Sequence, residues 1–247
     1  HLLRIHAGGR DGERPSRHLL SLRGAALTDH FSGVAAGYAR FRPTYPPSLF
    51  EHLASLTHGR RRAWDAATGS GQAAVGLATH FEQVIASDAS AAQISNAAPH
   101  QRVTYLVARG EASALRAESV DLVTVAQALH WLDIDAFFAE IRRVVRAGGV
   151  VAAWTYGILS LDDPGADGIL RRYAYDVVGP YWPPERAIVE SGYRGIPFPF
   201  DELPAPPVSL DAELGLTDLL GYVRTWSATS RYGAVRGEDP TVALEAA

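Results

Sequence analysis

The chain has 247 residues, of which 47% are hydrophobic, and a formal net charge of −4. This length and apolar content are enough for one domain with a full core, whereas the small charge excludes strong electrostatic attraction to nucleic acid or to an anionic membrane. The absence of cysteine excludes disulfides, thiolate nucleophiles and cysteine-based zinc sites. No stretch reaches the ~18 apolar residues of a spanning helix, so we expect a soluble and, without a recognisable signal peptide, cytoplasmic protein.

Residues 1–27 contain Gly, Arg and His without a sustained period of 3.6 or 2. We expect them to form a disordered extension in front of a single domain over residues 28–247. This domain divides into a core at 48–156 and a cap with the C-terminal part at 157–247. The chain contains no methionine, so we expect a processed or truncated product.

Helical and strand patterns alternate from residue 48 onward. The expected order is helix 48–56, strand 62–67, helix 72–81, strand 83–88, helix 90–98, strand 102–108, strand 120–129, helix 135–146 and strand 149–156. This alternation predicts an α/β fold, in which a doubly wound, Rossmann-like parallel sheet has helices on both faces. Residues 157–210 are rich in Pro, Gly and Tyr and predict a cap inserted over the sheet edge, followed by a helix at 216–228.

The stretch WDAATGSGQAA, residues 64–74, places Gly69 and Gly71 at the end of a predicted strand. Glycines at such a turn let the backbone approach a nucleotide-like ligand. With Ala74, and with Asp88 about 20 residues further on, they also fit the dinucleotide fingerprint of an NAD(P)-dependent dehydrogenase. However, Asp65 before the turn would repel a pyrophosphate and would attract the cationic methionyl part of S-adenosylmethionine. Asp65 therefore favours S-adenosylmethionine.

DAATGSGQ resembles motif I of the class I S-adenosylmethionine-dependent methyltransferases. Further segments over residues 29–230, among them GEASALRAESVDLVTVAQALHWLD and GPYWPPER, resemble the trans-aconitate methyltransferase-like, or methyltransferase type 11, branch. The resemblance implies that Asp88 binds the ribose hydroxyls, with a helix N-cap as the alternative role, and that Gly110 and Glu111 lie along the adenine. Arg109 stands where relatives often have an acid. The cofactor-binding residues implied are Asp65, Gly69, Ser70, Gly71, Asp88, Ala89, Gly110, Glu111 and Gln127.

At the end of the strand 120–129, Gln127, His130 and Trp131 face the region where a methyl acceptor would lie. His130 is the candidate catalytic residue, with packing as the alternative, and Trp131 is a candidate pocket wall. In similar enzymes an N-terminal segment folds over the site, and its arginines Arg40 and Arg42 either hold a carboxylate or form a solvated face. The same alternatives apply to Arg186 in the cap. The candidate pocket residues are Tyr38, Arg42, Tyr45, His130, Trp131, Tyr181 and Trp182.

The function predicted is transfer of a methyl group, by in-line displacement, from S-adenosylmethionine to a small-molecule acceptor, leaving S-adenosylhomocysteine. A carboxylate acceptor needs no general base, whereas a phenol-like one makes a base such as His130 useful. The alternatives are a non-catalytic S-adenosylmethionine-binding domain and, less favoured, a dehydrogenase. We expect no metal, because the nine histidines are scattered, no nucleic-acid or membrane partner, and a monomer or homodimer. The resemblance also implies a last antiparallel strand, which we expect to be missing from this sequence.

Overall fold

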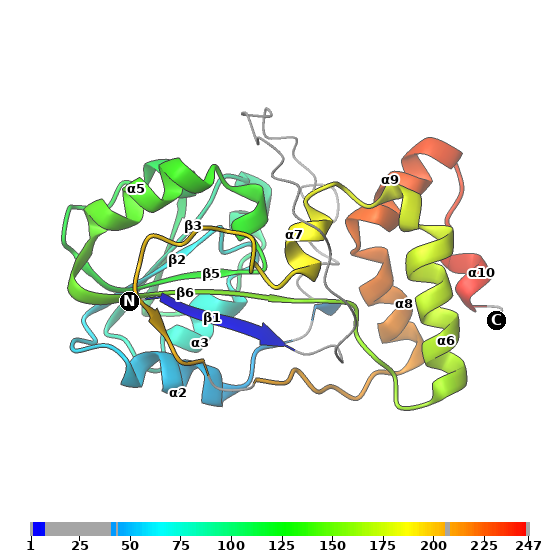
Figure 1. Cartoon of the computed structure of the whole chain (residues 1–247), viewed down its shortest axis with the longest axis horizontal. Helices are drawn as coiled ribbons and strands as arrows, with labels where there is room; N and C mark the ends of the chain where they lie inside the picture. Colours follow the sequence, from blue (N-terminus) through cyan, green and yellow to red (C-terminus); the bar gives the residue numbers. More distant parts are fainter. Residues whose placement is uncertain (1, 8–40, 43, 206–207, 246–247) are drawn as a thin grey trace.

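The computed structural model describes residues 2–7, 41–42, 44–205 and 208–245. The described part forms one seven-stranded sheet, with the order β4-β3-β2-β5-β6-β1-β7 and parallel pairing throughout (Figure 1). The strands are β1 (Leu2–Ala7), β2 (Arg62–Ala66), β3 (Gln83–Asp88), β4 (Val103–Val107), β5 (Val120–Ala126), β6 (Val145–Tyr156) and β7 (Glu202–Leu203). The order β4-β3-β2-β5-β6 is the 3-2-1-4-5 order of a Rossmann-like methyltransferase fold, which confirms the predicted α/β class. The direction of winding reverses between β2 and β5, where such sheets bind ligands.

Helices cover both faces of this sheet (Figure 1). Helix α5 (Ile134–Val144) lies on one face, and α2 (Pro47–Ser55) and α3 (Gln72–Leu77) lie on the other, while the short α4 (Ala91–Ser95) connects β3 to β4. Helix α5 is amphipathic and buries Phe137, Ile141 and Val144 against the sheet. The side chain of Asp133 caps its N-terminus by accepting a hydrogen bond from the Ala136 N–H at 3.1 Å.

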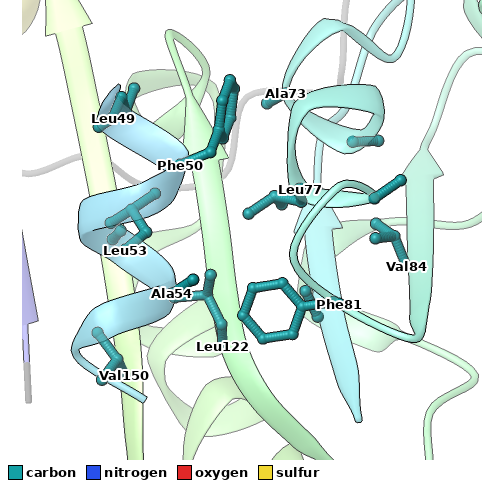
Figure 2. Packing of buried hydrophobic residues seen from close by; sticks show 14 of the residues in the cluster. Leu49, Phe50, Leu53, Ala54, Ala73, Leu77, Phe81, Val84, Leu122 and Val150 are labelled. Atoms are coloured by element: carbon teal, nitrogen blue, oxygen red, sulfur yellow. The ribbon is translucent and has the colours of Figure 1, made fainter. Parts of the chain in front are cut away.

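The contact between α2 and α3 is close and involves the last turn of α3. Figure 2 shows Phe50 and Leu53 of α2 packed with Leu77 of α3 above the sheet. A Cβ at Gly76 would lie 2.1 Å from the Phe50 ring, so the two helices approach at this distance only because residue 76 is glycine. This packing holds α3 directly behind the glycine turn that follows β2.

The edge of the sheet beyond β6 differs from the prediction. Residues 2–7, expected to belong to a disordered extension, form β1 and pair in parallel with β6, in the register Leu2 to Val151 through Ala7 to Tyr156. The short β7 then pairs with β1. The six residues LLRIHA alternate apolar and polar types from Leu3 onward, a signal too short to distinguish from chance. The predicted disorder of residues 8–27 lies outside the described residues.

The helices of residues 157–190 and 216–245 form a layer beside the sheet, mostly on the right of Figure 1, whereas β7 between these two segments belongs to the sheet. It contains α6 (Pro164–Arg172), a π-helical turn (Tyr173–Val177), a 3₁₀ turn (Gly179–Tyr181), α7 (Arg186–Glu190), α8 (Leu216–Arg224), α9 (Ser227–Arg236) and α10 (Thr241–Glu245). Its own apolar cluster includes Leu170, Tyr222 and Val223. The predicted helix 216–228 is wrong in one respect: Trp226, in extended conformation with ψ 137°, separates α8 from α9. None of the helices in the described ranges is long and apolar enough to cross a membrane.

Candidate functional site

The glycine turn between β2 and α3 is built from left-handed backbone conformations. Ala67 has φ 52°, Gly69 has φ 56° and Gly71 has φ 84°. A Cβ on Gly71 would lie 2.2 Å from the Tyr105 hydroxyl oxygen, so a side chain here would meet both a steric clash and backbone strain. Ser70, between the two glycines, is buried and its carbonyl accepts a hydrogen bond from the Ala98 N–H at 3.1 Å. The turn therefore exposes backbone rather than side chains at the carboxyl end of β2.

Asp65 is a buried carboxylate beside this turn. Its oxygens accept hydrogen bonds from the hydroxyls of Thr68, at 2.5 Å, and Thr124, at 2.7 Å. Burial raises the pKa of Asp65 from 3.8 to about 6, since the desolvation of the charge outweighs these hydrogen bonds and the nearby Asp88 carboxylate acts in the same direction. A cation placed next to Asp65 would reverse this shift. The arrangement thus suits a ligand that carries positive charge.

Asp88 connects the end of β3 to the glycine turn. Its Oδ2 accepts a hydrogen bond from the Gly69 N–H at 2.9 Å, and its Oδ1 accepts one from the Ser90 N–H at 2.8 Å. The sequence left a helix N-cap as an alternative role for Asp88. In the structure the N-cap of α4 is Ser90, whose hydroxyl accepts a hydrogen bond from the Gln93 N–H at 3.3 Å. Ala89, the other predicted cofactor-binding residue here, is exposed. Asp88 therefore fixes the glycine turn from the neighbouring strand.

Gln93 was not among the predicted residues, yet it lies in this part of the site. Its side chain is buried, and its Oε1 has no hydrogen-bond partner among the described residues. This oxygen would lie 3.9 Å from a Cβ on Gly69. A buried amide oxygen without a donor is unfavourable, so the position fits a hydrogen-bond donor on a bound molecule. The sequence signal was a polar residue in the first turn of a short helix, which is too common to single out.

Gln127 follows β5 in a left-handed conformation, with φ 54°. Its Oε1 accepts hydrogen bonds from the Thr155 hydroxyl, at 2.5 Å, and from the Tyr156 N–H, at 3.0 Å, and its Nε2 donates to the Tyr156 carbonyl at 2.9 Å. Both polar atoms of the side chain are thus hydrogen-bonded to residues at the end of β6. Gln127 holds the ends of two strands together and contributes to a cavity wall.

Gly110 and Glu111 lie in a 3₁₀ turn after β4. Oε1 of Glu111 accepts a hydrogen bond from the Asp133 N–H at 2.9 Å, and Oε2 forms an ion pair of 3.4 Å with the exposed Arg109. Gly110 is buried, with Leu132 and Phe137 3.4 Å from the position of a Cβ. In this structure the two residues support the start of α5, and their contact with adenine stays a prediction.

A cavity of ≈ 60 Å³ lies where the helical layer meets the carboxyl ends of β5 and β6. This is several times the roughly 10–15 Å³ that one water molecule needs. Among the described residues, no acidic residue lines the cavity. Its walls are mainly aromatic and basic and include Arg42, Gln127, His130, Trp131, Trp182, Arg186, Tyr222 and Trp226. No three His, Asp or Glu side chains in the described ranges lie together as a metal site would require.

The π-helical turn after α6 positions the indole of Trp182. The Val178 N–H donates to the Tyr173 carbonyl, five residues back, at 3.0 Å, so it does not bond the Ala174 carbonyl as it would in an α-helix. The Ala174 carbonyl instead accepts from Nε1 of Trp182 at 2.9 Å. The guanidinium of Arg186 lies over the Trp182 ring, 4.4 Å from its centre. The irregular turn therefore orients the aromatic surface that supports Arg186.

The two arginines of the cavity differ in their contacts. Arg42 donates from Nη1 to the Tyr156 hydroxyl at 3.2 Å and from Nη2 to the Thr225 carbonyl at 3.3 Å. Arg186 donates from Nε to Glu190 Oε1 at 3.1 Å, whereas its Nη2 is buried and has no hydrogen-bond partner in the described part of the chain. A guanidinium nitrogen in this state fits an anionic or carbonyl acceptor supplied by a ligand.

His130 lies in a 3₁₀ turn (Leu129–Trp131) at the cavity wall. Its Nδ1 is 3.1 Å from the hydroxyl oxygen of the buried Tyr193. Burial, followed by the charges of Arg186 and Arg42, lowers the pKa of His130 from 6.5 to about 3. The imidazole is therefore neutral at physiological pH and is a weak base.

The structure brings together four of the predicted pocket residues and separates others. Arg42, His130, Trp131 and Trp182 line the same cavity. Two predictions need correction, because Tyr45 packs edge-on against Trp154, 5.3 Å between ring centres, and Tyr181 accepts a hydrogen bond from Arg236 on α9 at 3.0 Å. Neither residue belongs to the cavity wall. Tyr38 and Arg40 lie outside the described residues.

Tyr222 and Trp226 line the cavity and were not predicted. Tyr222 is in the last turn of α8 and Trp226 is the extended residue before α9, and their rings meet edge to face with centres 5.7 Å apart. The aromatic spacing i, i+4 was the available signal, but it also occurs on any helix that packs against a core.

Comparison with known proteins agrees with this geometry. The sequence profile of the methyltransferase domain family, type 11, matches residues 64–153. A protein of Dictyostelium discoideum named as a methyltransferase is 34% identical over 214 residues, covering 85% of this chain and 81% of that protein. An assigned S-adenosylmethionine-dependent methyltransferase of Saccharomyces cerevisiae is 31% identical, covering 60% of this chain and 55% of that protein.

Among solved structures, that of an assigned type II methyltransferase from Anaeromyxobacter dehalogenans is similar to this chain with a TM-score of 0.76. The two sequences are 47% identical, and the match covers 83% of this chain and 86% of that one. The sheet order, the glycine turn with its buried acid and these relatives agree. This chain belongs to the class I S-adenosylmethionine-dependent methyltransferases.

Proposed function

We propose that this methyltransferase acts on a small acceptor that carries a carboxylate, bound in the cavity between Arg42 and Arg186. The observation that carries the proposal is the buried Nη2 of Arg186, which has no partner among the described residues and lies in a cavity without an acidic wall residue there. A carboxylate would accept a charge-assisted hydrogen bond from this nitrogen and would neutralise the guanidinium charge.

S-adenosylmethionine supplies the methyl group when it is bound, and the residues at the ends of β2 and β3 fit it. Asp65 offers a buried carboxylate to the cationic methionyl part, and Gln93 offers an acceptor without a donor. Asp88 stands at the end of β3, where it would accept hydrogen bonds from the ribose hydroxyls. Gly69 leaves room for the ligand along the backbone, and Gly71 allows the turn to approach the Tyr105 hydroxyl closely. The roles of Gly110 and Glu111 at the adenine are part of the same proposal.

A carboxylate acceptor also agrees with the protonation states in the cavity. A carboxylate is ionised at neutral pH and is itself the nucleophile, so no side chain has to remove a proton. A phenol would need a base, and His130, with its pKa lowered to about 3, is poorly suited to that role. The contribution of the protein is then alignment of the acceptor and exclusion of water by the aromatic walls.

The experiment that tests the proposal is release of S-adenosylhomocysteine in the presence of succinate, benzoate or phenol. Succinamide and benzamide serve as neutral acceptors of the same shape. We expect turnover with at least one of the two acids, none with its amide and none with phenol. Methylation of phenol without methylation of either acid would contradict the proposal.

The arginine itself is tested by Arg186→Gln. We expect the KM of the accepted acid to rise about 10- to 100-fold, the equivalent of losing a hydrogen bond to a charged group. Arg171→Gln is the matched control, because Arg171 is on α6, forms an ion pair with Asp167 at 2.6 Å and does not line the cavity. An equal effect of the two substitutions would contradict the assignment of Arg186.

A further inference from the structure

Tyr193 is a buried tyrosine whose hydroxyl contacts the cavity-lining His130. Its side chain has 0% exposure, and its hydroxyl oxygen lies 3.1 Å from Nδ1 of His130. The N–H groups of Leu129 and His130 and the hydroxyl of Thr155 also face this oxygen. It lies behind the cavity wall formed by His130 rather than in it. A fully buried hydroxyl on a cavity-lining histidine indicates a role in fixing that histidine.

The hydrogens of this pair can be assigned from the inventory of donors and acceptors. A neutral imidazole has one N–H and one bare nitrogen, and a tyrosine hydroxyl has one hydrogen to donate. The N–H groups of Leu129 and His130 already face the Tyr193 oxygen, which has two acceptor lone pairs. If Nδ1 carried the histidine proton, it would be a third donor aimed at the same oxygen, which is unfavourable. If the Tyr193 hydroxyl donates to a bare Nδ1, both groups are satisfied. The proton of His130 then resides on Nε2.

We infer that Tyr193 is a positioning residue, which holds His130 as the Nε2–H tautomer so that His130 donates a hydrogen bond into the cavity instead of accepting a proton there. Nε2 forms no hydrogen bond with any described residue and is the ring nitrogen left for a ligand. The statement that this ligand is the acceptor carboxylate rests on the proposed function. The assignment of the His130 tautomer is independent of the proposed function.

The charged groups around His130 favour the same assignment. Arg42 and Arg186 act on it with positive charge, and the acid on α7, Glu190, is already bonded to Nε of Arg186 at 3.1 Å. Arg194, beside Tyr193, is exposed. Tyr156, at the end of β6, accepts from Arg42, and Trp131 stacks beside the imidazole with ring centres 4.8 Å apart. Two guanidinium groups and an imidazole N–H would give a cavity that offers donors to an anion.

The backbone around Tyr193 makes the contact well defined. Tyr193 has φ 62°, and its N–H donates to the Ile188 carbonyl at 3.1 Å, closing the turn after α7. Its ring packs in the same apolar cluster as Leu129, Phe138 and Ile196. Figure 1 shows α7 between the sheet and the helices α6, α8 and α9. The Tyr193–His130 contact therefore joins the end of β5 to the segment that carries Arg186.

The test is the ¹⁵N NMR signature of His130 in the unliganded full chain, assigned by the signals that disappear in His130→Asn. We expect long-range ¹H–¹⁵N couplings to show a protonated Nε2 and a bare Nδ1 at about pH 7. The opposite tautomer in the wild-type protein would overturn the inference. This measurement needs neither cofactor nor acceptor, so its failure is separate from failure of the acid turnover experiment.

A pair of variants tests the positioning role. In Tyr193→Phe, Nδ1 loses its donor, so we expect a mixture of tautomers and a higher pKa of His130, and, if succinate is the accepted acid, a several-fold rise in its KM with little change in kcat. Tyr173→Phe is the matched control, because Tyr173 is also buried and its hydroxyl bonds Thr229 at 3.0 Å, away from the cavity. Unchanged His130 signals in Tyr193→Phe, or the same change in both variants, would overturn the inference.

Discussion

The guanidinium of Arg186 lies 4.4 Å from the centre of the Trp182 ring, and Nε1 of Trp182 donates to the carbonyl of Ala174 in the π-helical turn. The cation–π contact leaves the guanidinium charge in place while it limits the directions in which the side chain can point. The irregular backbone between α6 and α7 thus controls the orientation of the group that we assign to the acceptor carboxylate.

Two substitutions separate the functions of Trp182. Trp182→Phe keeps a ring under Arg186 and removes the hydrogen bond to Ala174, so we expect the free energy of unfolding in urea to fall by about 1 kcal/mol. Trp182→Leu also removes the ring, and we expect a further rise, several-fold, in the KM of the accepted acid. Equal KM values for the two variants would show that the ring does not support Arg186.

Replacing Asp65 tests the electrostatic state of the glycine turn. Because the pKa of Asp65 is raised to about 6 in the folded chain, the folded state keeps its proton between about pH 4 and 6, where the unfolded chain has lost it. Stability therefore falls as the pH rises through this window. Asp65→Asn removes the penalty, so we expect its stability relative to the wild type to increase by about 2 kcal/mol from pH 4 to pH 7.

The measurement for Asp65→Asn is urea unfolding of both chains at the two pH values, without cofactor. The same variant should bind S-adenosylhomocysteine more weakly at pH 7, since the neutral amide no longer attracts the amino acid ammonium group. A stability difference that is independent of pH would contradict the raised pKa of Asp65.

Gly71→Ala tests the need for glycine at the turn. The new Cβ would lie 2.2 Å from the Tyr105 hydroxyl oxygen on a backbone with φ 84°, so we expect a loss of at least about 2 kcal/mol in the free energy of unfolding. Gly168→Ala is the matched control in α6, where nothing lies within 4 Å of the new Cβ, and helix propensity predicts a gain of up to about 1 kcal/mol. A loss confined to Gly168→Ala would refute this account.

Asp88→Ala tests the ribose assignment by calorimetric titration with S-adenosylhomocysteine. We expect affinity to fall about 5- to 150-fold, the equivalent of about 1–3 kcal/mol for hydrogen bonds to a charged group. Asp88→Ala also removes the acceptor of the Gly69 and Ser90 N–H groups, and this accounts for part of the loss in affinity. Asp88→Asn, which retains one side-chain oxygen, is therefore measured as a second variant. Affinity equal to the wild type in Asp88→Ala would exclude the ribose role.

The sheet could be predicted because its signals are local. β2, β3 and β5 are mostly buried strands, and each has a predicted site residue at or beside its end, namely Asp65, Asp88 and Gln127. The glycines after β2 indicate the turn within a few residues. The alternation of strands and helices predicts right-handed connections and a parallel sheet, whereas the strand order comes from the structure. Asp65 and Asp88 could be assigned for the same reason, since the carboxyl ends of adjacent parallel strands meet at one edge.

The cavity could be predicted only in part, because its walls meet through long-range contacts. His130 and Trp131 follow a recognisable strand, whereas Tyr193 is 63 residues away in a segment without periodicity. Its importance depends on burial and on a turn with φ 62°, neither of which the residue type reveals. Tyr45 and Tyr181 show the converse, since both are aromatic and near the site in sequence, yet they pack elsewhere.

The proposed cofactor-binding residues and the wall of the acceptor cavity come mostly from separate stretches of the chain. The residues that we propose for the cofactor lie between 65 and 111, at the strand ends and in the segments that follow them, whereas most of the cavity wall comes from 157–227. Mutations in 157–227 can therefore change the preferred acceptor while they leave the cofactor-binding residues unaltered. Such a division favours divergence of acceptor preference in evolution, and it makes chimeras that exchange residues 157–245 between relatives a practical route to new specificities.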